Sequence, residues 1–302
     1  MNIDFMGNKK WLFAFSGLLI AISIGALLVR GLAFGIEFQG GSVMTFTHAD
    51  AISVEQMRDA LDEAGVGGAG TAVIQKTDEG DFIVRTSEQD ADDASRQAVA
   101  VVEVLGLPMQ DVNVTTIGPG WGKNVTNAAL IALAVSIIAI IGYVSVRFEY
   151  KMSLTAIAAL VHDVLIVLGF YALVGHEVTP NTVAALLTIL GYSLYDTVVV
   201  FHRIRENAQN LVKRSFQQMA NDSINQVLAR SINTTITSLI PVVCLLTFGG
   251  STLKDFAFAL VVGLALGAYS SPAVAAPLFA LWKEREPRFQ ALKRKAEAHA
   301  AK

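Results

Sequence analysis

The run GYSLYDTVVVFHRIRE, which extends from Gly191 to Glu206, contains one carboxylate, Asp196, in an otherwise apolar stretch that ends in basic residues. An ionisable side chain in the middle of a membrane helix costs roughly 2.5 kcal/mol or more, so such residues generally face the protein interior and mark functional sites. If this run is a membrane helix, Asp196 is a candidate functional residue, and the rest of the chain must supply the bundle around it.

The composition indicates a membrane protein. Hydrophobic residues make up 53% of the 302-residue chain, charged residues make up only 16%, and the mean hydropathy is +0.50. These values lie outside the range of ordinary soluble domains. Cys244 is the only cysteine, which excludes an intrachain disulfide.

Six mostly apolar runs have the length needed for a helix that crosses a hydrocarbon core of about 30 Å. They lie at residues 11–29, 125–146, 152–174, 180–202, 231–248 and 255–281. The first run could also be a signal peptide, but its length and the lack of a following A-x-A-like cleavage site favour a retained helix. We therefore predict one membrane helix at residues 11–30 and five more within residues 124–282.

The connections between these runs alternate in charge, which predicts the topology. The turn at 147–151, the segment 203–230 and the tail 283–302 are basic, whereas residues 35–118 contain fifteen Asp or Glu and four Lys or Arg. By the positive-inside rule, the N-terminal segment 1–10 and the C-terminal tail are cytoplasmic. The acidic segment 31–123 then lies outside the cytoplasm, and the protein is a multi-pass protein of the cell membrane.

The acidic segment has the pattern of a small α+β domain. Strand-like runs at 42–47, 72–76, 82–85 and 112–117 alternate with helix-like runs at 53–65 and 90–105. The order is βαββαβ, so we predict a ferredoxin-like domain between the first and second membrane helices.

Polar residues interrupt the predicted membrane helices at three places, and together they suggest a proton relay. Asp196 lies in the fourth helix, His162 and Asp163 lie near the middle of the third, and Arg230 begins the fifth. Apolar surroundings favour the protonated form of a carboxyl group and a nearby guanidinium favours the charged form. Movement of Arg230 would therefore switch Asp196 between binding and releasing a proton. The supporting polar candidates are Ser193, Thr197, Thr234 and Thr235.

A structural interpretation of the same residues stays open, because buried polar groups can simply hydrogen-bond within a bundle and Arg230 could reach lipid headgroups. Small residues recur at every fourth position in the first and last helices, which favours close helix packing and could also serve a second membrane protein. No Walker-type, CxxC, HExxH or Ser-His-Asp pattern is present. We therefore expect no enzyme activity and no nucleotide or metal cofactor.

Five motifs resemble those of the SecF family, the six-helix subunits of the bacterial protein-export accessory complex, which belong to the resistance-nodulation-division superfamily. They lie at 35–41, 159–164, 191–200, 203–206 and 225–231. The resemblance implies a bacterial inner-membrane protein that pairs with SecD and uses the proton-motive force to help preproteins leave the SecYEG channel on the outer side. It also implies YajC and membrane lipids as partners and no nucleic acid.

Matched residue by residue, the family assigns the proton-relay aspartate to Asp196 and its accompanying arginine to Arg230. The first motif has an implied structural role, and its residues are Gly35, Glu37, Phe38, Gly40 and Gly41. The sequence departs from the family pattern at three positions: Glu37 replaces the commoner Asp, Tyr195 replaces a frequent Asn before Asp196, and His202 replaces a frequent acidic residue. Two other functions remain open, a translocon scaffold without energy coupling and an exporter of small molecules or lipids.

Overall fold

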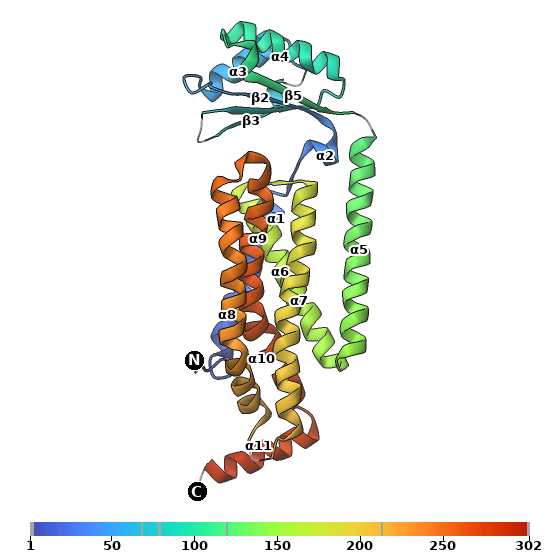
Figure 1. Cartoon of the computed structure of the whole chain (residues 1–302), viewed down its shortest axis with the longest axis vertical. Coiled ribbons are helices and arrows are strands. Elements are labelled where there is room, and N and C mark those ends of the chain that lie inside the picture. The colour runs from blue at the N-terminus through green and yellow to red at the C-terminus, as the bar shows by residue number, and fades with distance from the viewer. Residues whose placement is uncertain (1–2, 68, 78–79, 119, 213, 301–302) are drawn as a thin grey trace. The chain divides into compact units, whose positions relative to one another are not determined.

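The computed structural model describes residues 3–67, 69–77, 80–118, 120–212 and 214–300. The first two residues of the predicted N-terminal segment and the last two of the predicted tail therefore lie outside the described residues. The chain divides into two compact units, one of residues Met1–Ala33 with Ala132–Lys302 and one of residues Phe34–Ile131. The larger unit is a helical bundle, and the smaller is an α+β unit (Figure 1).

Within the described residues, six helices are long and apolar enough to cross a membrane, as the hydropathy of the sequence predicts. They are α1 (Lys9–Val29), α5 (Trp121–Arg147), α6 (Tyr150–Val174), α7 (Pro180–Gln209), α8 (Phe216–Phe248) and the continuous segment Leu253–Glu284. This last segment contains most of α9 (Gly250–Ser270), a π-helical turn η3 (Ser271–Ala275) and α10 (Ala276–Glu284). A further helix, α11 (Pro287–Ala300), follows, and the short strand β6 (Glu177–Val178) precedes α7. The prediction of six membrane helices is confirmed.

Helices α7 and α8 begin at capping boxes. The Thr179 hydroxyl accepts a hydrogen bond from the backbone N–H of Thr182, and Pro180 occupies the first helical turn, where its missing N–H is not needed. Ser215 caps α8 in the same way through Gln218. Helix α8 therefore begins at Phe216, fifteen residues before the apolar run predicted at 231–248. The segment 203–230, predicted as a basic connection, is largely helical because α7 extends to Gln209 and α8 begins at Phe216.

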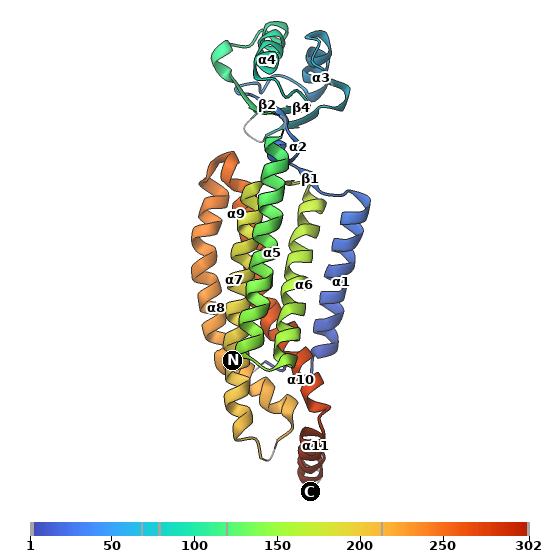
Figure 2. The same ribbon diagram turned by 90° about the vertical axis from the view of Figure 1, so that its right-hand side faces the viewer.

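The bundle is held together by close approaches at small residues. A Cβ atom on Gly263 of α9 would lie 2.3 Å from the Ile189 side chain of α7, and one on Gly169 of α6 would lie 2.2 Å from Ser23 of α1. Figure 2 shows α1 beside α6, with which it makes extensive contacts. In contrast, a Cβ on Gly17 or Gly25 would meet no atom within 4 Å among the described residues. The small residues of α9 therefore serve internal packing, whereas those glycines of α1 face open space.

An ion-pair cluster joins the α6 and α10 ends of the bundle to the start of α11. The Lys151 ammonium lies 2.8 Å from a Glu286 carboxylate oxygen, and the Lys283 ammonium lies 3.0 Å from the same oxygen and 2.7 Å from Glu149. Partial burial raises the pKa of Glu286, but hydrogen bonds and charges from the two lysines outweigh it, so this pKa lies below its ordinary value. Glu286 is therefore ionised at neutral pH.

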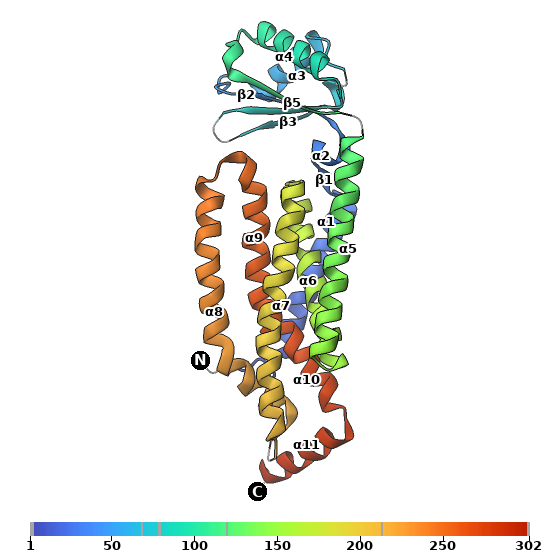
Figure 3. The ribbon, with the colours of Figure 1, turned by 45° about the vertical axis from the view of Figure 1, so that its right-hand side comes forward.

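The smaller unit has the predicted βαββαβ element order. Its four-stranded sheet has the order β3-β4-β2-β5, and every neighbouring pair is antiparallel. Its strands are β2 (Gly41–Phe46), β3 (Val73–Lys76), β4 (Phe82–Thr86) and β5 (Val112–Ile117). Strand β1 (Ala33–Phe34) and the short helix α2 (Ile36–Gln39) precede them. The helices α3 (Val54–Glu63) and α4 (Ala91–Leu105) cover one face of the sheet (Figure 3), with short 3-10 turns at Ala69–Thr71 and Met109–Asp111.

The core of this unit follows from strand alternation. Met44, Phe46, Phe82 and Val84 point from β2 and β4 to the helix-covered face and are completely buried. Met57 and Leu61 of α3 and Val101 of α4 complete this core from the helices. The unit thus has a hydrophobic core of its own.

Gly41, the first residue of β2, has a backbone that only glycine tolerates. Its φ is 121°, and a Cβ atom there would lie 2.4 Å from the carbonyl oxygen of Thr86 on the neighbouring strand. We expect Gly41→Ala to lower the free energy of unfolding of this unit by about 1 to 3 kcal/mol, the usual cost of a strained backbone, or by more if β4 must shift. Limited proteolysis of the full-length protein measures this change as faster cleavage within residues 34–131.

Gly67→Ala is the matched control for Gly41, because its φ is not positive and a Cβ there would meet nothing within 4 Å among the described residues. It should be cleaved at the rate of the unsubstituted protein. Equal resistance of both variants would show that the strand tolerates a side chain at Gly41.

Candidate functional site

Asp196 borders a cavity between α7, α8 and α9. The cavity has a volume of about 180 Å³, and its polar lining includes Ser193, Thr234 and Thr235. The Asp196 side chain is partly buried, and one of its carboxylate oxygens accepts a hydrogen bond of 2.8 Å from the Ser231 hydroxyl of α8. The structure thus brings together a carboxylate, several hydroxyl groups and enough space for water molecules within the membrane bundle.

Arg230 lies one residue before the hydrogen-bond partner of Asp196, but its own side chain is directed elsewhere. It is exposed, and among the described residues it forms no hydrogen bond or ion pair with Asp196. Successive residues of a helix point about 100° apart, so with Ser231 directed at Asp196 the Arg230 side chain leaves α8 in another direction. A contact between Arg230 and Asp196 would need another Arg230 rotamer or a movement of α8.

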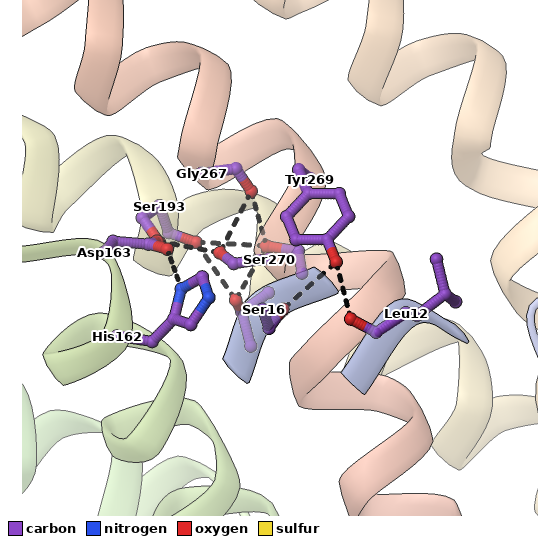
Figure 4. A network of polar contacts seen from close by, with 10 residues as sticks. Leu12, Ser16, His162, Asp163, Ser193, Gly267, Tyr269 and Ser270 are labelled. Atoms are coloured by element: carbon purple, nitrogen blue, oxygen red, sulfur yellow. Dashed lines mark hydrogen bonds and ion pairs between the residues drawn. The ribbon is translucent and has the colours of Figure 1, made fainter. Parts of the chain in front are cut away.

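Asp163 of α6 is the centre of a second polar cluster (Figure 4). Its side chain is 1% exposed and accepts hydrogen bonds from the Ser193 hydroxyl of α7 at 2.6 Å and the Ser270 hydroxyl of α9 at 2.7 Å. The neighbouring His162 Nδ1 lies 2.9 Å from the other carboxylate oxygen. Asp163 therefore links α6, α7 and α9 through hydrogen bonds, and each of its carboxylate oxygens has a polar partner.

The junction between α9 and the π-helical turn η3 supplies two hydroxyl groups, Ser270 at the end of α9 and Ser271 at the start of η3. Pro272 lies in its first turn and has no N–H to continue the α-helical hydrogen-bond pattern, which accounts for the local widening. The Ser271 hydroxyl is 2.8 Å from the Thr197 hydroxyl of α7, which also donates to the carbonyl of Ser193. Such turns occur frequently at functional sites, and this one places Ser270 and Ser271 beside both predicted α7 hydroxyl residues.

Ser193 connects the two clusters. Its hydroxyl donates to Asp163, and the same residue lines the cavity that contains Asp196. The predicted residues Asp196, Asp163, His162, Ser193, Thr197, Thr234 and Thr235 thus lie in one connected polar region across α6, α7 and α8. Arg230 is the predicted member that the structure leaves outside it.

His162 has one ring nitrogen without a partner. Its Nε2 is buried and forms no hydrogen bond within the part of the chain that the structure describes. The His162 ring centroid lies 6.5 Å from that of Tyr269, whose hydroxyl contacts Ser16 at 3.0 Å and donates to the Leu12 carbonyl of α1 at 2.9 Å (Figure 4). The His162 Nε2 atom is thus a buried polar atom without a hydrogen-bond partner among the described residues.

The motif residues of the smaller unit have structural positions. Gly35 is the N-cap of α2, Glu37 lies in its first turn, and Gly40 closes it with a φ of 77°. The rings of Phe38 and Phe34 pack edge to face with centroids 6.0 Å apart. A Cβ atom added to Gly122 would lie 2.6 Å from the backbone carbonyl oxygen of Phe38, so only glycine allows this close approach. This segment shapes the entry to β2.

The sequence analysis did not single out four residues of the polar region: Ser16, Ser231, Tyr269 and Ser270. Serine hydroxyls are common in membrane helices because they can bond to their own backbone, so nothing in the sequence separated these from the rest. The described residues contain no group of three His, Cys, Asp or Glu side chains that could hold a metal ion.

A bundle of six helices long and apolar enough to cross a membrane, with the buried Asp163 and the partly buried Asp196 between them, defines the class of multi-pass membrane proteins. A family model for the C-terminal region of the protein export membrane proteins SecD and SecF matches residues 98–285, and a model for the SecD/SecF GG motif matches residues 25–47. The chain belongs to the SecD/SecF family of protein export membrane proteins, which confirms the resemblance in its motifs.

Two curated relatives and a crystal structure give the extent of this similarity. The protein translocase subunit SecF of Streptomyces coelicolor is 41% identical over 100% of this chain and 82% of its own length. The protein translocase subunit SecDF of Thermus thermophilus is 35% identical over 97% of this chain but 40% of its own. The crystal structure of SecDF from that organism matches with a TM-score of 0.84 and 34% identity over 94% of this chain. This chain spans 39% of that longer chain.

The names of these relatives describe a transport role. They are translocase subunits, and the chain described here is accordingly a translocase subunit homologue in which the ionisable residues lie inside a helical bundle. The family also explains why the motifs at 35–41 and 191–200 occur in one chain, since the two family models together cover both.

Proposed function

We propose that this protein is a proton-driven accessory subunit of the Sec translocon that promotes movement of preproteins on the outer side of the bacterial cell membrane. One observation carries the proposal: Asp196 faces a hydroxyl-lined cavity within the bundle, and no cation among the described residues neutralises it. In the observed arrangement, such a carboxylate can bind a proton without first breaking an ion pair. A purely structural hydrogen bond to Ser231 needs no cavity beside it.

In this proposal the proton enters the cavity, binds Asp196 and weakens the attraction for Ser231. Thr234 and Thr235 of α8 line the cavity beside Asp196, and their hydroxyl groups hydrogen-bond to water on the proton route. Ser193 links this cavity to Asp163 and His162. A displacement of α8 that exchanges Ser231 for Arg230 beside Asp196 favours the charged form and releases the proton. The relay therefore couples protonation to the position of α8.

The mechanical output in this proposal comes from the unit of residues 34–131, which we predicted from the positive-inside rule to lie outside the cytoplasm. One charge moved across 100 mV is worth roughly 2.3 kcal/mol, enough to reverse the populations of two nearly balanced states of such a unit. Binding and release of an exported chain by this unit would then follow the proton cycle. Both chain termini lie in the cytoplasm in this arrangement.

SecD is the proposed direct partner. The relatives from Thermus thermophilus and Bacillus subtilis are named SecDF, and this chain covers only 40% and 38% of their lengths. Their remaining length leaves room for a SecD part on the same polypeptide. SecYEG, YajC and preprotein chains follow as partners through the shared family role.

The test is an export assay in inverted membrane vesicles from the host organism, with and without this protein. We expect the protein to accelerate late preprotein translocation only when a proton gradient is present, and a protonophore to remove the difference. Co-purification from native membranes should recover a SecD-like chain. Equal stimulation with and without the gradient would instead favour a scaffold role, and the absence of a SecD-like chain would favour another kind of exporter.

A further inference from the structure

A second cavity lies at the end of the bundle that carries both chain termini. It has a volume of about 520 Å³, is open on one side, and is lined by the ends of α5, α6, α7, α8, α10 and α11. Figure 3 shows α10 and α11 at the same end of the bundle as the connection between α5 and α6. The proposed proton relay uses none of the residues that line it.

The inner lining of this cavity is aromatic. Phe216 of α8, Phe279 of α10 and Phe289 of α11 pack on one another, with ring centroids 5.8 Å apart for Phe216 and Phe279 and 4.7 Å apart for Phe216 and Phe289. Phe148 lines the side formed by the connection between α5 and α6. These aromatic side chains provide an apolar surface for a bound ligand.

The rim of the cavity carries excess positive charge. Arg147, Arg205 and Arg288 line it, and within the described residues none of them forms an ion pair with a carboxylate. The lining contains one further cation, Lys283, and one carboxylate, Glu149, which pair with each other at 2.7 Å. Arg205 Nη1 donates to the Arg147 carbonyl at 3.4 Å, and the Arg288 guanidinium lies over the Phe289 ring at 5.5 Å. These contacts leave N–H donors on all three guanidinium groups for an anion, and their fork suits the oxygens of a phosphate.

Neighbouring side chains place this cavity at the level of lipid headgroups. Tyr150 and Trp282 pack edge to face at 5.9 Å, and such amphipathic aromatic residues gather at the membrane interface. Val146, which also lines the cavity, is 91% exposed at the end of α5 and can face lipid chains. The cavity therefore combines a polar rim with access from the hydrocarbon.

We propose that this cavity binds the headgroup of an anionic phospholipid from the leaflet on the side of the chain termini, with Arg147, Arg205 and Arg288 around the phosphate. The aromatic lining and the lipid-facing Val146 favour a phospholipid over a free phosphate ion, which has no apolar part to bury. Basic pockets between helix ends are the usual form of such sites.

The test is native mass spectrometry of the full-length protein released from nanodiscs that contain equal amounts of dioleoylphosphatidylglycerol and dioleoylphosphatidylcholine. The unsubstituted protein should retain phosphatidylglycerol preferentially. In the variant Arg147→Gln/Arg205→Gln/Arg288→Gln the preference should disappear, since each basic contact contributes about fivefold to affinity. Replacement of the same residues by Lys should retain part of the preference, because the charge remains and the planar fork is lost.

The control variant Arg285→Gln/Arg294→Gln/Lys295→Gln removes the same number of positive charges at the same end of the bundle, and none of its residues lines the cavity. It should retain phosphatidylglycerol like the unsubstituted protein. An equal loss in this control would show that diffuse surface charge, and not the cavity, attracts the lipid. Equal retention of both lipids by the unsubstituted protein would also overturn the proposal.

A second measurement separates the lipid from a free anion. In nanodiscs of phosphatidylcholine alone, millimolar inorganic phosphate should leave the melting temperature unchanged, whereas inclusion of phosphatidylglycerol should raise it. Stabilisation by phosphate equal to that by phosphatidylglycerol, and absent in the triple Gln variant, would assign the cavity to a free anion instead. Neither result depends on Asp196, so this proposal and the proton relay can fail separately.

Discussion

Replacement of Asp196 by Asn is expected to abolish the stimulation of preprotein export by a proton gradient while the complex stays assembled. Asn has nearly the same shape as Asp and can still accept the hydrogen bond from Ser231, so packing around the α7, α8 and α9 cavity should persist. It cannot bind and release a proton in this pH range. Export in vesicles with an imposed gradient should therefore fall to the rate measured without a gradient.

Two further variants make this result specific. Asp196→Glu keeps an ionisable group one methylene further along and should retain part of the stimulation. Asp222→Asn removes a carboxylate that lies at the bundle end and pairs with Arg214 at 2.5 Å, so it should leave the gradient effect unchanged. Normal gradient-driven export by Asp196→Asn would remove the relay and leave the scaffold interpretation.

Replacement of Asp163 separates the structural and relay interpretations of the second cluster. Asp163→Leu leaves the hydroxyls of Ser193 and Ser270 without their acceptor, and each interhelical hydrogen bond in a membrane contributes about 0.6 to 2 kcal/mol. The free energy of unfolding should therefore fall by about 1 to 3 kcal/mol, and the protein should melt at a lower temperature in detergent.

Asp163→Asn is the matched variant, because its amide can still bond with both serine hydroxyls. We expect its melting temperature to stay close to that of the unsubstituted protein and its gradient-driven export to fall, since the link from the Asp196 cavity through Ser193 would end on a group that does not titrate. Full export by the Asn variant together with a destabilised Leu variant would show that Asp163 only packs the bundle.

Local sequence patterns predicted the membrane helices and the order of elements in the smaller unit. The six membrane helices followed from apolar runs, and the βαββαβ order followed from alternation and caps such as Ser53, which forms a capping box with Gln56. The choice of Asp196 and Asp163 as candidate functional residues followed from the cost of placing a carboxylate in hydrocarbon. These features depend on residues close together in the sequence.

The partners of these carboxylates could not be predicted in the same way. The sequence analysis paired Asp196 with Arg230, yet the structure places Ser231 against it, because a shift of one residue turns a helix by about 100°. Ser270 was equally hidden, since its contact with Asp163 depends on how the end of α9, just before the π-helical turn Ser271–Ala275, packs against α6. Neither helix rotation nor turn type can be deduced from hydropathy.

The sequence by itself determined that this is a six-helix membrane protein with ionisable residues inside its bundle, because water and hydrocarbon sort residues by type whatever their distant neighbours are. Only the tertiary structure decided that Asp196 opens onto a cavity while Asp163 is enclosed by three helices, and that three arginines from separate helices surround one pocket. Those arrangements depend on how helices far apart in the chain rotate and pack against one another, which local physical chemistry does not fix.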